Sequence, residues 1–505
     1  MLQLDGNSLT LELVAEIADA QTEVALSSAA RQRVDRSRRV VDRMAAGDEA
    51  VYGINTGFGA LAETMIPRES LAALQLNLLR SHAAGVGEFL SSRAVRATMA
   101  LRANVLAKGF SGIRAETLDL LLAMLNRRVH PVVPSRGSVG ASGDLAPLAH
   151  MALVMVGEGH ATVGGGPVQR GAAALAAADL KPVSLAPKEG LALINGTQPS
   201  AAVAALACVA AETLARSADI AAALSIDALQ GSFKPFDRRI HEARPHSGQQ
   251  ISAANILGLL TGSDINKSHE HCGRVQDAYS LRCAAQVHGA ARDALFFAGR
   301  TLTTEANGAT DNPMVFGEDD EIISGGNFHG APVSIAADLL AIAVAQFATI
   351  SERRSDRLVN PALSGLPPFL TTESGLQSGY MMAQVTAAAL ASELKTLAHP
   401  ASVDTIPTSA NKEDHVSMSM GAALKAEAAV ALAAHVIAVE VLCACQALDL
   451  LAPLKTSAPL QQVHAHVRSL VPPLTADRPP SSDIERISRA LLSGELIRAS
   501  GAEVK

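Results

Sequence analysis

Residues 137–145, Gly-Ser-Val-Gly-Ala-Ser-Gly-Asp-Leu, contain a tripeptide whose own atoms could react with one another. The glycines allow the backbone to fold back on itself, a geometry that a Cβ atom blocks in most residues. The Gly143 amide nitrogen could then attack the Ala141 carbonyl carbon. If water left from the ring and from the Ser142 side chain, the product would be an imidazolone with an exocyclic methylene. No standard side chain is such an electrophile, so the chain could act on amines without a borrowed cofactor.

The residues around this tripeptide decide between that chemistry and an ordinary flexible loop. Residues 134–136 (Pro-Ser-Arg) precede it, and residues 144–150 (Asp-Leu-Ala-Pro-Leu-Ala-His) follow it. The whole pattern resembles the aromatic amino acid ammonia-lyases, most of all the branch that acts on histidine. The resemblance implies a 4-methylidene-imidazol-5-one (MIO) group formed autocatalytically from Ala141, Ser142 and Gly143, with no external cofactor.

A second loop, residues 51–59 (Val-Tyr-Gly-Ile-Asn-Thr-Gly-Phe-Gly), carries one of only three tyrosines in the chain. Its glycines disfavour a helix, and a half-buried Tyr52 in an ordinary turn is the simple interpretation. The loop is similar to a family motif whose tyrosine is the catalytic base. The resemblance therefore gives that role to Tyr52.

A leucine stripe at helical spacing in residues 71–78 continues to His82, just before a glycine-rich stop. A histidine at this place could simply cap carbonyls at the negative end of the helix. The stretch 81–85 (Ser-His-Ala-Ala-Gly) nevertheless resembles the histidine branch, in which this histidine faces the substrate ring. His82 is therefore a candidate substrate-binding residue.

A run of charges in residues 408–418 would normally be a solvated surface. The run resembles a motif of the histidine branch whose glutamate contacts the imidazole, which makes Glu413 a candidate substrate-binding residue. Lys412 stands where that branch more usually has glutamine. An ion pair between Lys412 and Glu413 would take the carboxylate away from the substrate.

In residues 276–283, Tyr279 and Arg282 are three residues apart and so share a helical face. Arg282 could pair with an acid such as Asp277, or could bind a substrate carboxylate through its two-pronged guanidinium. The segment is similar to the family's, although Ala278 stands where the histidine branch usually has proline. The resemblance makes Tyr279 a second candidate catalytic residue and adds Gln276 to substrate binding.

Three further candidates for substrate binding have structural alternatives. Asn195 could be a helix cap, but the resemblance gives it a hydrogen bond within the site. Phe328, in a glycine-rich turn, could line the pocket. Met381 is at the position of a pocket wall that touches the substrate ring, although a buried core methionine is the competing interpretation.

Composition limits the partners. The net charge of −7 has no basic block, which argues against nucleic acid. Apolar runs such as 428–439 are interrupted or followed by polar residues, so we expect no membrane span. The N-terminus resembles no secretory signal and five scattered cysteines form no disulfide framework, so we expect a cytoplasmic protein. The patterns 269–272 and 443–445 lack zinc-site spacing, and no metal is expected.

Long alanine- and leucine-rich segments predict an all-α protein. They are residues 199–230, 274–306, 331–358, 376–397 and 415–449. Many are apolar on several faces, as in a helical bundle, and only 18% of residues are charged, which favours oligomers. We expect an N-terminal helical domain (1–200) bearing the electrophile loop and a long-helix bundle with C-terminal helices (201–505), with a short hairpin within 153–168. The resemblance implies the fumarase/aspartase-like ammonia-lyase fold and a homotetramer.

The resemblance implies elimination of ammonia from L-histidine to give trans-urocanate. An amine is a poor leaving group, and its addition to the electrophile would remedy this; attack by the ring instead stays open. Tyr52, held as phenolate by positive helix ends, would remove the weakly acidic β-proton. The alternatives are a tyrosine or phenylalanine lyase or aminomutase, disfavoured by His82 with Glu413, and a non-catalytic scaffold, disfavoured by the intact tripeptide with Tyr52.

Overall fold

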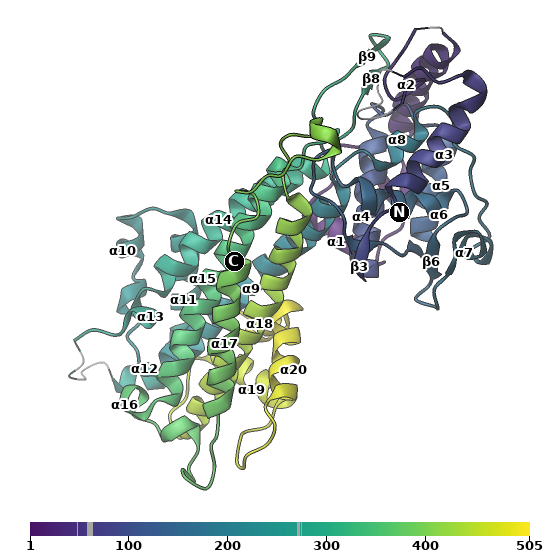
Figure 1. Ribbon diagram of the computed structural model, residues 1–505. Coiled ribbons are helices and arrows are strands. Elements are labelled where there is room, and N and C mark those ends of the chain that lie inside the picture. The colour runs from purple at the N-terminus through teal and green to yellow at the C-terminus, as the bar shows by residue number, and fades with distance from the viewer. Residues whose placement is uncertain (48, 58–63, 270–272, 274) are drawn as a thin grey trace. The chain divides into compact units, whose positions relative to one another are not determined.

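The computed structural model describes residues 1–47, 49–57, 64–269, 273 and 275–505, and most of these are helical (Figure 1). The chain divides into two compact units. Unit 1 consists of Met1–Val209, Gly299–Asp338 and Pro400–Leu424, and unit 2 of Ala210–Ala298, Leu339–His399 and Lys425–Lys505. Each unit therefore draws on three separate stretches of sequence. The sequence-based division into 1–200 and 201–505 stays a prediction.

Unit 1 contains the first eight helices. Several begin at a serine or threonine whose side chain accepts a hydrogen bond from the backbone three residues on, as at Thr10, Ser27 and Ser91. The helices are α1 (Leu11–Ala18), α2 (Ser28–Ala46), α3 (Leu71–His82), α4 (Ser92–Ala107), α5 (Ala115–Asn126), α6 (Leu145–Met155), α7 (Gly171–Ala177) and α8 (Glu189–Ile194). Helix α4 is buried along nearly its whole length and forms the centre of this unit.

The strands of unit 1 are short and serve to tie loops together. β1 (Leu2–Leu4) pairs in parallel with β2 (Val24–Leu26), and β3 (Val86–Phe89) pairs antiparallel with β5 (Pro134–Arg136). β6 (His160–Val163) lies between β4 (Val129–Pro131) and β7 (Gln169–Arg170), and β8 (Met314–Phe316) pairs with β9 (Glu321–Ile323). The predicted hairpin forms between β6 and β7, whose second strand lies just beyond the predicted range. The pairing of β3 with β5 joins the segment after α3 to the segment before the Ala141–Gly143 loop.

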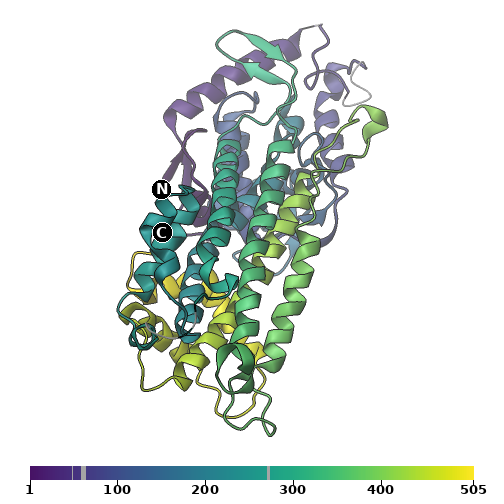
Figure 2. The ribbon, with the colours of Figure 1, turned by 90° about the vertical axis from the view of Figure 1, so that its left-hand side faces the viewer.

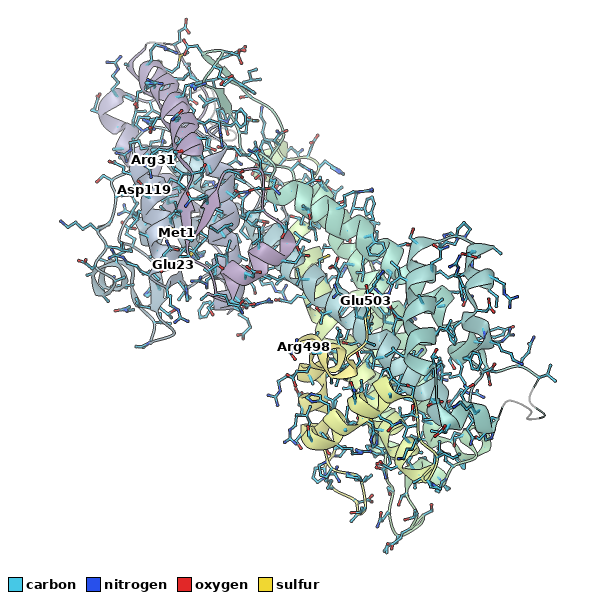
Figure 3. The ribbon with its side chains drawn as sticks, turned by 180° about the vertical axis from the view of Figure 1, so that it is seen from behind. Met1, Glu23, Arg31, Asp119, Arg498 and Glu503 are labelled. Atoms are coloured by element: carbon cyan, nitrogen blue, oxygen red, sulfur yellow. The ribbon has the colours of Figure 1, made fainter. Side chains whose placement is uncertain are left out.

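Ion pairs on the surface of unit 1 connect its helices. Arg31 of α2 and Asp119 of α5 face one another (Figure 3), with 2.6 Å between Nη2 and Oδ1. Both side chains are more than two-fifths exposed, so solvent screens the pair and it contributes little to stability. The core of the unit therefore depends on apolar packing rather than on these surface charges.

Four long helices have residues in both units: α9 (Gln198–Ala228), α14 (Ala284–Ala306), α15 (Ala331–Val359) and α18 (Ser419–Leu450). Among the described residues, α9, α15 and α18 are long and apolar enough to cross a membrane by length and composition alone. However, 72–78% of their most apolar stretches is buried inside the protein. Packing within the protein thus accounts for their apolar character.

The remaining helices lie in unit 2, where the long helices run side by side in both views (Figures 1 and 2). The remaining helices are α10 (Arg238–Glu242), α11 (Ser247–Leu260), α12 (Asp264–Ser268), α13 (Tyr279–Arg282), α16 (Pro361–Ser364), α17 (Met381–Leu397), α19 (Ala458–Leu470), α20 (Ser481–Leu492) and α21 (Glu495–Ser500). Each of the five long segments predicted from the sequence holds one long helix. The all-α prediction is confirmed.

Candidate active site

A cavity of about 850 Å³ within unit 1 is large enough for an amino-acid substrate. It is lined by side chains from loops and helix ends that are far apart in the sequence. Seven of the residues singled out from the sequence line it: Tyr52, His82, Ala141, Ser142, Asn195, Phe328 and Glu413. The cavity is therefore the candidate active site.

The tripeptide loop is folded tightly at its glycines. Gly140 and Gly143 have φ values of +66° and +70°, which disfavour residues with a side chain. A Cβ at Gly143 would overlap the Gly196 carbonyl, and one at Gly140 would overlap the Ser419 hydroxyl. Only glycine fits at either position, which agrees with the folded-back geometry expected from the sequence.

The loop is also fixed from outside. The Gly140 carbonyl accepts hydrogen bonds from the Gly330 N–H (3.1 Å) and the Ser417 hydroxyl (2.9 Å). On the other side of the tripeptide, the Asp144 N–H donates to the Gly196 carbonyl at 2.8 Å. These bonds leave the segment from Ala141 to Gly143 compact and held at both ends.

Ser142 itself has two partners. Its hydroxyl donates to Glu413 Oε1 at 2.6 Å, and its carbonyl accepts a hydrogen bond of 2.8 Å from the Asn195 side-chain amide. Asn195 stands at the C-terminal end of α8 rather than at a helix start. Asn195 is therefore the C-cap of α8 and not the N-terminal cap that its place in the sequence suggested, and its side chain binds the loop instead.

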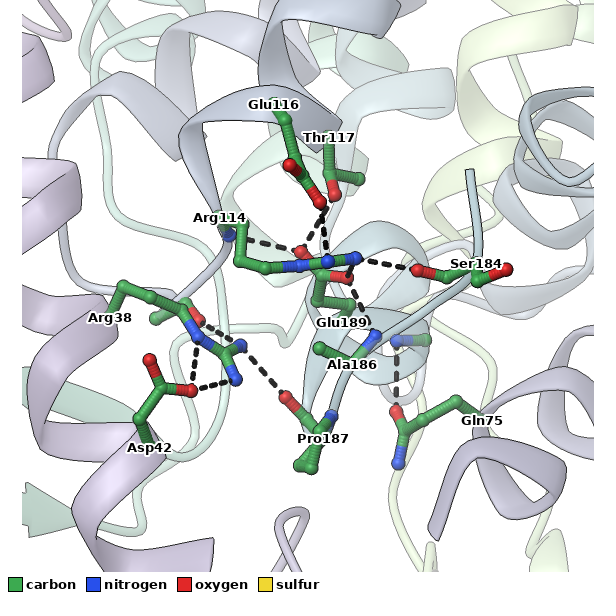
Figure 4. Close-up of polar contacts among 12 residues, drawn as sticks. Arg38, Asp42, Gln75, Arg114, Glu116, Thr117, Ser184, Ala186, Pro187 and Glu189 are labelled. Atoms are coloured by element: carbon green, nitrogen blue, oxygen red, sulfur yellow. Dashed lines mark hydrogen bonds and ion pairs between the residues drawn. The ribbon is translucent and has the colours of Figure 1, made fainter. Parts of the chain in front are cut away.

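Helix α8 positions Asn195, and its start is anchored by a buried carboxylate (Figure 4). Glu189 accepts hydrogen bonds from Arg114 Nη2 (2.6 Å), Thr117 Oγ1 (2.7 Å) and the Ala186 N–H (2.8 Å). A fully buried carboxylate is tolerated only when it is satisfied in this way. The anchored start fixes where the helix ends, and so where Asn195 lies.

A buried glutamine ties α8 to α3. Gln75 Oε1, on α3, accepts a hydrogen bond of 2.9 Å from the Gly190 N–H at the start of α8 (Figure 4). Both helices end at the cavity, α3 with His82 and α8 just before Asn195. The hydrogen bond thus holds together the two helices that carry His82 and Asn195, two of the predicted site residues.

A buried arginine fixes the turn after α8. Arg102 Nη1 donates to the Asn195 carbonyl (3.0 Å) and to Gln198 Oε1 (2.7 Å). Burial lowers the pKa of Arg102 to about 10, so the guanidinium keeps its charge at neutral pH. Arg102 is therefore a structural brace for the backbone that carries Asn195.

His82 both caps its helix and lines the cavity. Its Nδ1 lies 2.9 Å from the Leu78 carbonyl, which can only accept, so Nδ1 carries the hydrogen of this bond. Burial lowers the pKa of His82, against smaller opposing effects of the Leu78 bond and of Glu413. The ring is therefore neutral at pH 7, and Nε2 keeps a lone pair for a ligand N–H. The capping interpretation of His82 is therefore confirmed, and its role in substrate binding stays a prediction.

Glu413 is held by three hydroxyl groups. Oε1 accepts from Ser142, and Oε2 accepts from Thr408 Oγ1 (2.7 Å) and Ser409 Oγ (2.8 Å). Burial alone would raise the pKa of Glu413, but these hydrogen bonds outweigh burial and the pKa lies below its usual value. Across the described residues, no ion pair joins Lys412 to this carboxylate. Glu413 is therefore an ionised acceptor at the cavity.

The turn that carries Tyr52 is stabilised by an asparagine. Asn55 Oδ1 accepts from the Val51 N–H at 2.7 Å, and Asn55 Nδ2 donates to the Glu49 carbonyl at 2.8 Å. Tyr52 lines the cavity from this turn. The end of the predicted motif, residues 58–59, lies outside the described residues.

The sequence matches the family model for aromatic amino acid lyases over residues 9–469. Histidine ammonia-lyase of Anaeromyxobacter dehalogenans (strain 2CP-C) is 56% identical over 98% of this chain and 99% of its own, and that of Koribacter versatilis is 54% identical over 99% of both. The chain belongs to the aromatic amino acid lyase family. The family resemblance drawn from the sequence is confirmed.

Solved structures of family proteins share this fold. The crystal structure of histidine ammonia-lyase from Trypanosoma cruzi has a TM-score of 0.92 at 44% identity, covering 99% of this chain and 95% of that chain. Tyrosine aminomutase from Streptomyces globisporus has a TM-score of 0.94 at 37% identity over the whole of both chains. The predicted ammonia-lyase fold is confirmed, and it is shared by proteins named as lyases and as aminomutases.

Five predicted site residues of this family member are not among those that line the cavity of unit 1: Gly143, within the loop itself, and four residues of unit 2. Gln276, Tyr279, Arg282 and Met381 all belong to unit 2, where Gln276 and Arg282 line a separate cavity of about 460 Å³. The Arg282 guanidinium lies 4.7 Å from the centre of the Tyr279 ring, a cation–π contact, and Tyr279 is 71% exposed. Met381, at the start of α17, is partly exposed rather than buried in the core.

Two histidines at the unit 1 cavity were not selected from the sequence. The rings of His329 and His415 stack with centroids 5.8 Å apart, and His329 Nε2 lies 3.1 Å from the His415 carbonyl. Both line the cavity. His329 is next to Phe328 and His415 is two residues after Glu413, both predicted site residues. That proximity in the sequence could have indicated that the two histidines lie at the site.

Metal-binding patterns find no support in the described part of the chain, where no group of three potential ligands gathers. Cys443 and Cys445 are buried in α18, and burial raises the pKa of both thiols, that of Cys445 to about 12. Both are therefore protonated thiols at neutral pH. Most of the pattern 269–272 lies outside the described residues.

Proposed function

We propose that the chain is a histidine ammonia-lyase that eliminates ammonia from L-histidine to give trans-urocanate. The observation that carries this proposal is the meeting of His82 and Glu413 with the Ala141–Gly143 loop in one cavity. Histidine ammonia-lyases more than half identical over nearly the full length support the same substrate. A tyrosine or phenylalanine lyase or aminomutase is the alternative, and the imidazole-binding pair disfavours it.

The loop fits the MIO group that we propose it forms. Gly143, whose nitrogen must attack, and Ala141, whose carbonyl must receive it, are held in a tight turn where no Cβ fits at residue 143. Asn195 holds the Ser142 carbonyl. Once formed, the group would supply an electrophilic carbon that turns the substrate amine into a better leaving group.

The chain's own side chains then bind the substrate. His82 Nε2 and the Glu413 carboxylate are both acceptors in the protonation states described above. A neutral imidazole has one N–H group and an imidazolium has two, so the protonated ring offers one donor to each acceptor, whereas a phenyl or phenol ring has none on its ring atoms. The pair therefore selects and orients the imidazole. Removal of the proton from the β-carbon then requires a separate base.

We assign that base to Tyr52. A matched substitution, Tyr52→Phe, keeps the ring and removes only the hydroxyl. We expect turnover of histidine to fall about 10²–10⁴-fold, the usual contribution of general-base catalysis, while the intact mass still lies two waters below the mass that the variant encodes. Steady-state rates and mass spectrometry measure the two quantities. Near-normal turnover would assign the base elsewhere, with Tyr279 next.

The proposal includes a cytoplasmic homotetramer that takes only a small-molecule amino-acid substrate. Large apolar side chains are exposed on the long helices: Phe296, Phe297, Ile335, Ile342, Met382 and Val385. Exposed apolar groups of this number favour burial against further copies of the chain. A neighbouring copy could then bring Arg282 and Tyr279 to the unit 1 cavity, where Arg282 would bind the substrate carboxylate.

The test of the function is direct. Purified protein incubated separately with L-histidine, L-tyrosine and L-phenylalanine should release ammonia from histidine and form trans-urocanate, seen by its ultraviolet absorbance. The conjugated acids of the other two substrates should form far more slowly. Preferred turnover of tyrosine or phenylalanine would support the alternative, and a shift of the amino group to the β-carbon would identify an aminomutase.

A further inference from the structure

The hydroxyl that must leave during maturation of the loop is bonded to a carboxylate. Ser142 Oγ lies 2.6 Å from Glu413 Oε1. This distance is typical of a charge-assisted O–H···O⁻ hydrogen bond. The contact joins residues 271 positions apart, so it depends on the folded chain.

The rest of the carboxylate is fixed so that Oε1 points to Ser142. Thr408 and Ser409 hold Oε2. Residues 409–411 are consecutive non-glycine residues in the left-handed region, with φ values of +49°, +53° and +65°. Such backbone is costly, and it persists only where its surroundings impose it. The segment is thus built to present Glu413 in one orientation.

The other carboxylate of the loop is engaged elsewhere. Asp144 is fully buried and accepts hydrogen bonds from the Ser138 hydroxyl (2.6 Å) and the Ser200 N–H (2.8 Å). Burial raises the pKa of Asp144, although these bonds oppose the rise. Among the described residues, Glu413 is therefore the carboxyl group in contact with the hydroxyl that departs.

We propose that Glu413 catalyses the dehydration of Ser142 before it binds substrate, an inference that rests on the proposed function. In this step the Cα–H and Cβ–Oγ bonds of Ser142 break and a Cα–Cβ double bond forms. Glu413 takes the Cα proton, becomes a carboxylic acid, and returns the proton to the departing oxygen, which leaves as water. The carboxylate is regenerated and no other reactant is needed.

The same step prepares the site. Once the Ser142 hydroxyl has left, Oε1 of Glu413 loses its donor, while Oε2 keeps Thr408 and Ser409. An acceptor in a partly buried site is costly to leave unpaired. Maturation therefore creates the acceptor that the substrate N–H uses, and an unmatured chain has that acceptor occupied by its own serine.

The experiment follows the intact mass of newly synthesised protein over time. Wild type should become lighter by two waters. Glu413→Gln, which keeps the shape of the side chain, should lose the second water at least about 10²-fold more slowly and accumulate a species lighter by one water. Asp414→Asn is the matched control, because Asp414 lines the same cavity and makes no bond to Ser142; it should mature at the wild-type rate.

The outcomes separate this inference from the proposed function. Wild type that stays at its encoded mass contradicts the proposed function. Wild type lighter by two waters together with Glu413→Gln maturing equally fast overturns only the role of Glu413. If circular dichroism shows that Glu413→Gln is unfolded, the double variant Thr408→Val/Ser409→Ala, which frees Oε2, takes its place. Wild-type maturation of that folded variant overturns the inference, and slowed loss of the second water supports it.

Discussion

Replacing Ser142 with alanine is expected to abolish ammonia release from histidine. Alanine has no oxygen to leave from Cβ, so no exocyclic methylene can form, whatever the backbone does. The amine of the substrate then has no electrophile to attack, and no standard side chain replaces one. The loss should be complete within the sensitivity of the assay, which is a larger effect than removal of the base.

Two measurements check this result. Trans-urocanate formation should be undetectable, and the intact mass should show that the variant never loses the second water. Ser324→Ala is a matched control, since Ser324 is an exposed serine that also lines the cavity and has no assigned role. It should lose two waters from its own encoded mass, as wild type does, and keep wild-type activity. Activity of Ser142→Ala near that of the control would remove the built-in electrophile from the proposal.

The chemistry that we propose for the loop could be inferred from the sequence because all the reacting atoms lie within three consecutive residues and the residues around them resemble the family. Covalent geometry places Ala141 and Gly143 near one another once glycine permits the turn. The long helices were predictable for a similar reason. A predominantly apolar, alanine-rich composition over 20 or more residues, as in α18, leaves few alternatives to a buried helix.

Contacts between distant segments could not be predicted in the same way. The way residues 408–418 fold back on the loop determines the hydrogen bond between Ser142 and Glu413. It also determines that Glu413 accepts from hydroxyl groups and does not pair with Lys412. The local sequence does not predict the left-handed backbone at residues 409–411, because none of these residues is glycine. The roles of these residues came from resemblance, and their geometry came from the structure.

The same distinction explains Gln276, Tyr279, Arg282 and Met381. Resemblance could assign them to substrate binding, but no pattern in the sequence says which cavity of the fold they line. In the structure they belong to unit 2, and their roles stay predictions. Assembly of several chains is a property of surfaces, so it is not encoded in the local periodicity that predicts helices.

Histidine should be preferred over phenylalanine by roughly 10⁴–10⁵-fold in kcat/KM. A site built to hydrogen-bond its substrate rejects an analogue that lacks the groups, because the site's own polar atoms would be left buried without partners. Here those atoms are His82 Nε2 and the Glu413 carboxylate. Of the two, His82 is the better residue to change, since Glu413 is also bonded to Ser142.

His82→Leu should therefore reduce the preference for histidine over phenylalanine, because leucine makes one wall of the cavity apolar. Histidine turnover should fall and phenylalanine turnover should rise. The variant should still lose two waters from its own encoded mass, because His82 makes no hydrogen bond to the loop. Parallel kcat/KM measurements on both substrates give the ratio. Leu78→Met, one turn earlier on α3, is a control that keeps an apolar residue at the cavity.

If wild type accepts phenylalanine as readily as histidine, the histidine assignment fails while membership of the lyase family stands. If His82→Leu leaves the ratio unchanged, recognition of the imidazole depends on Glu413 without His82.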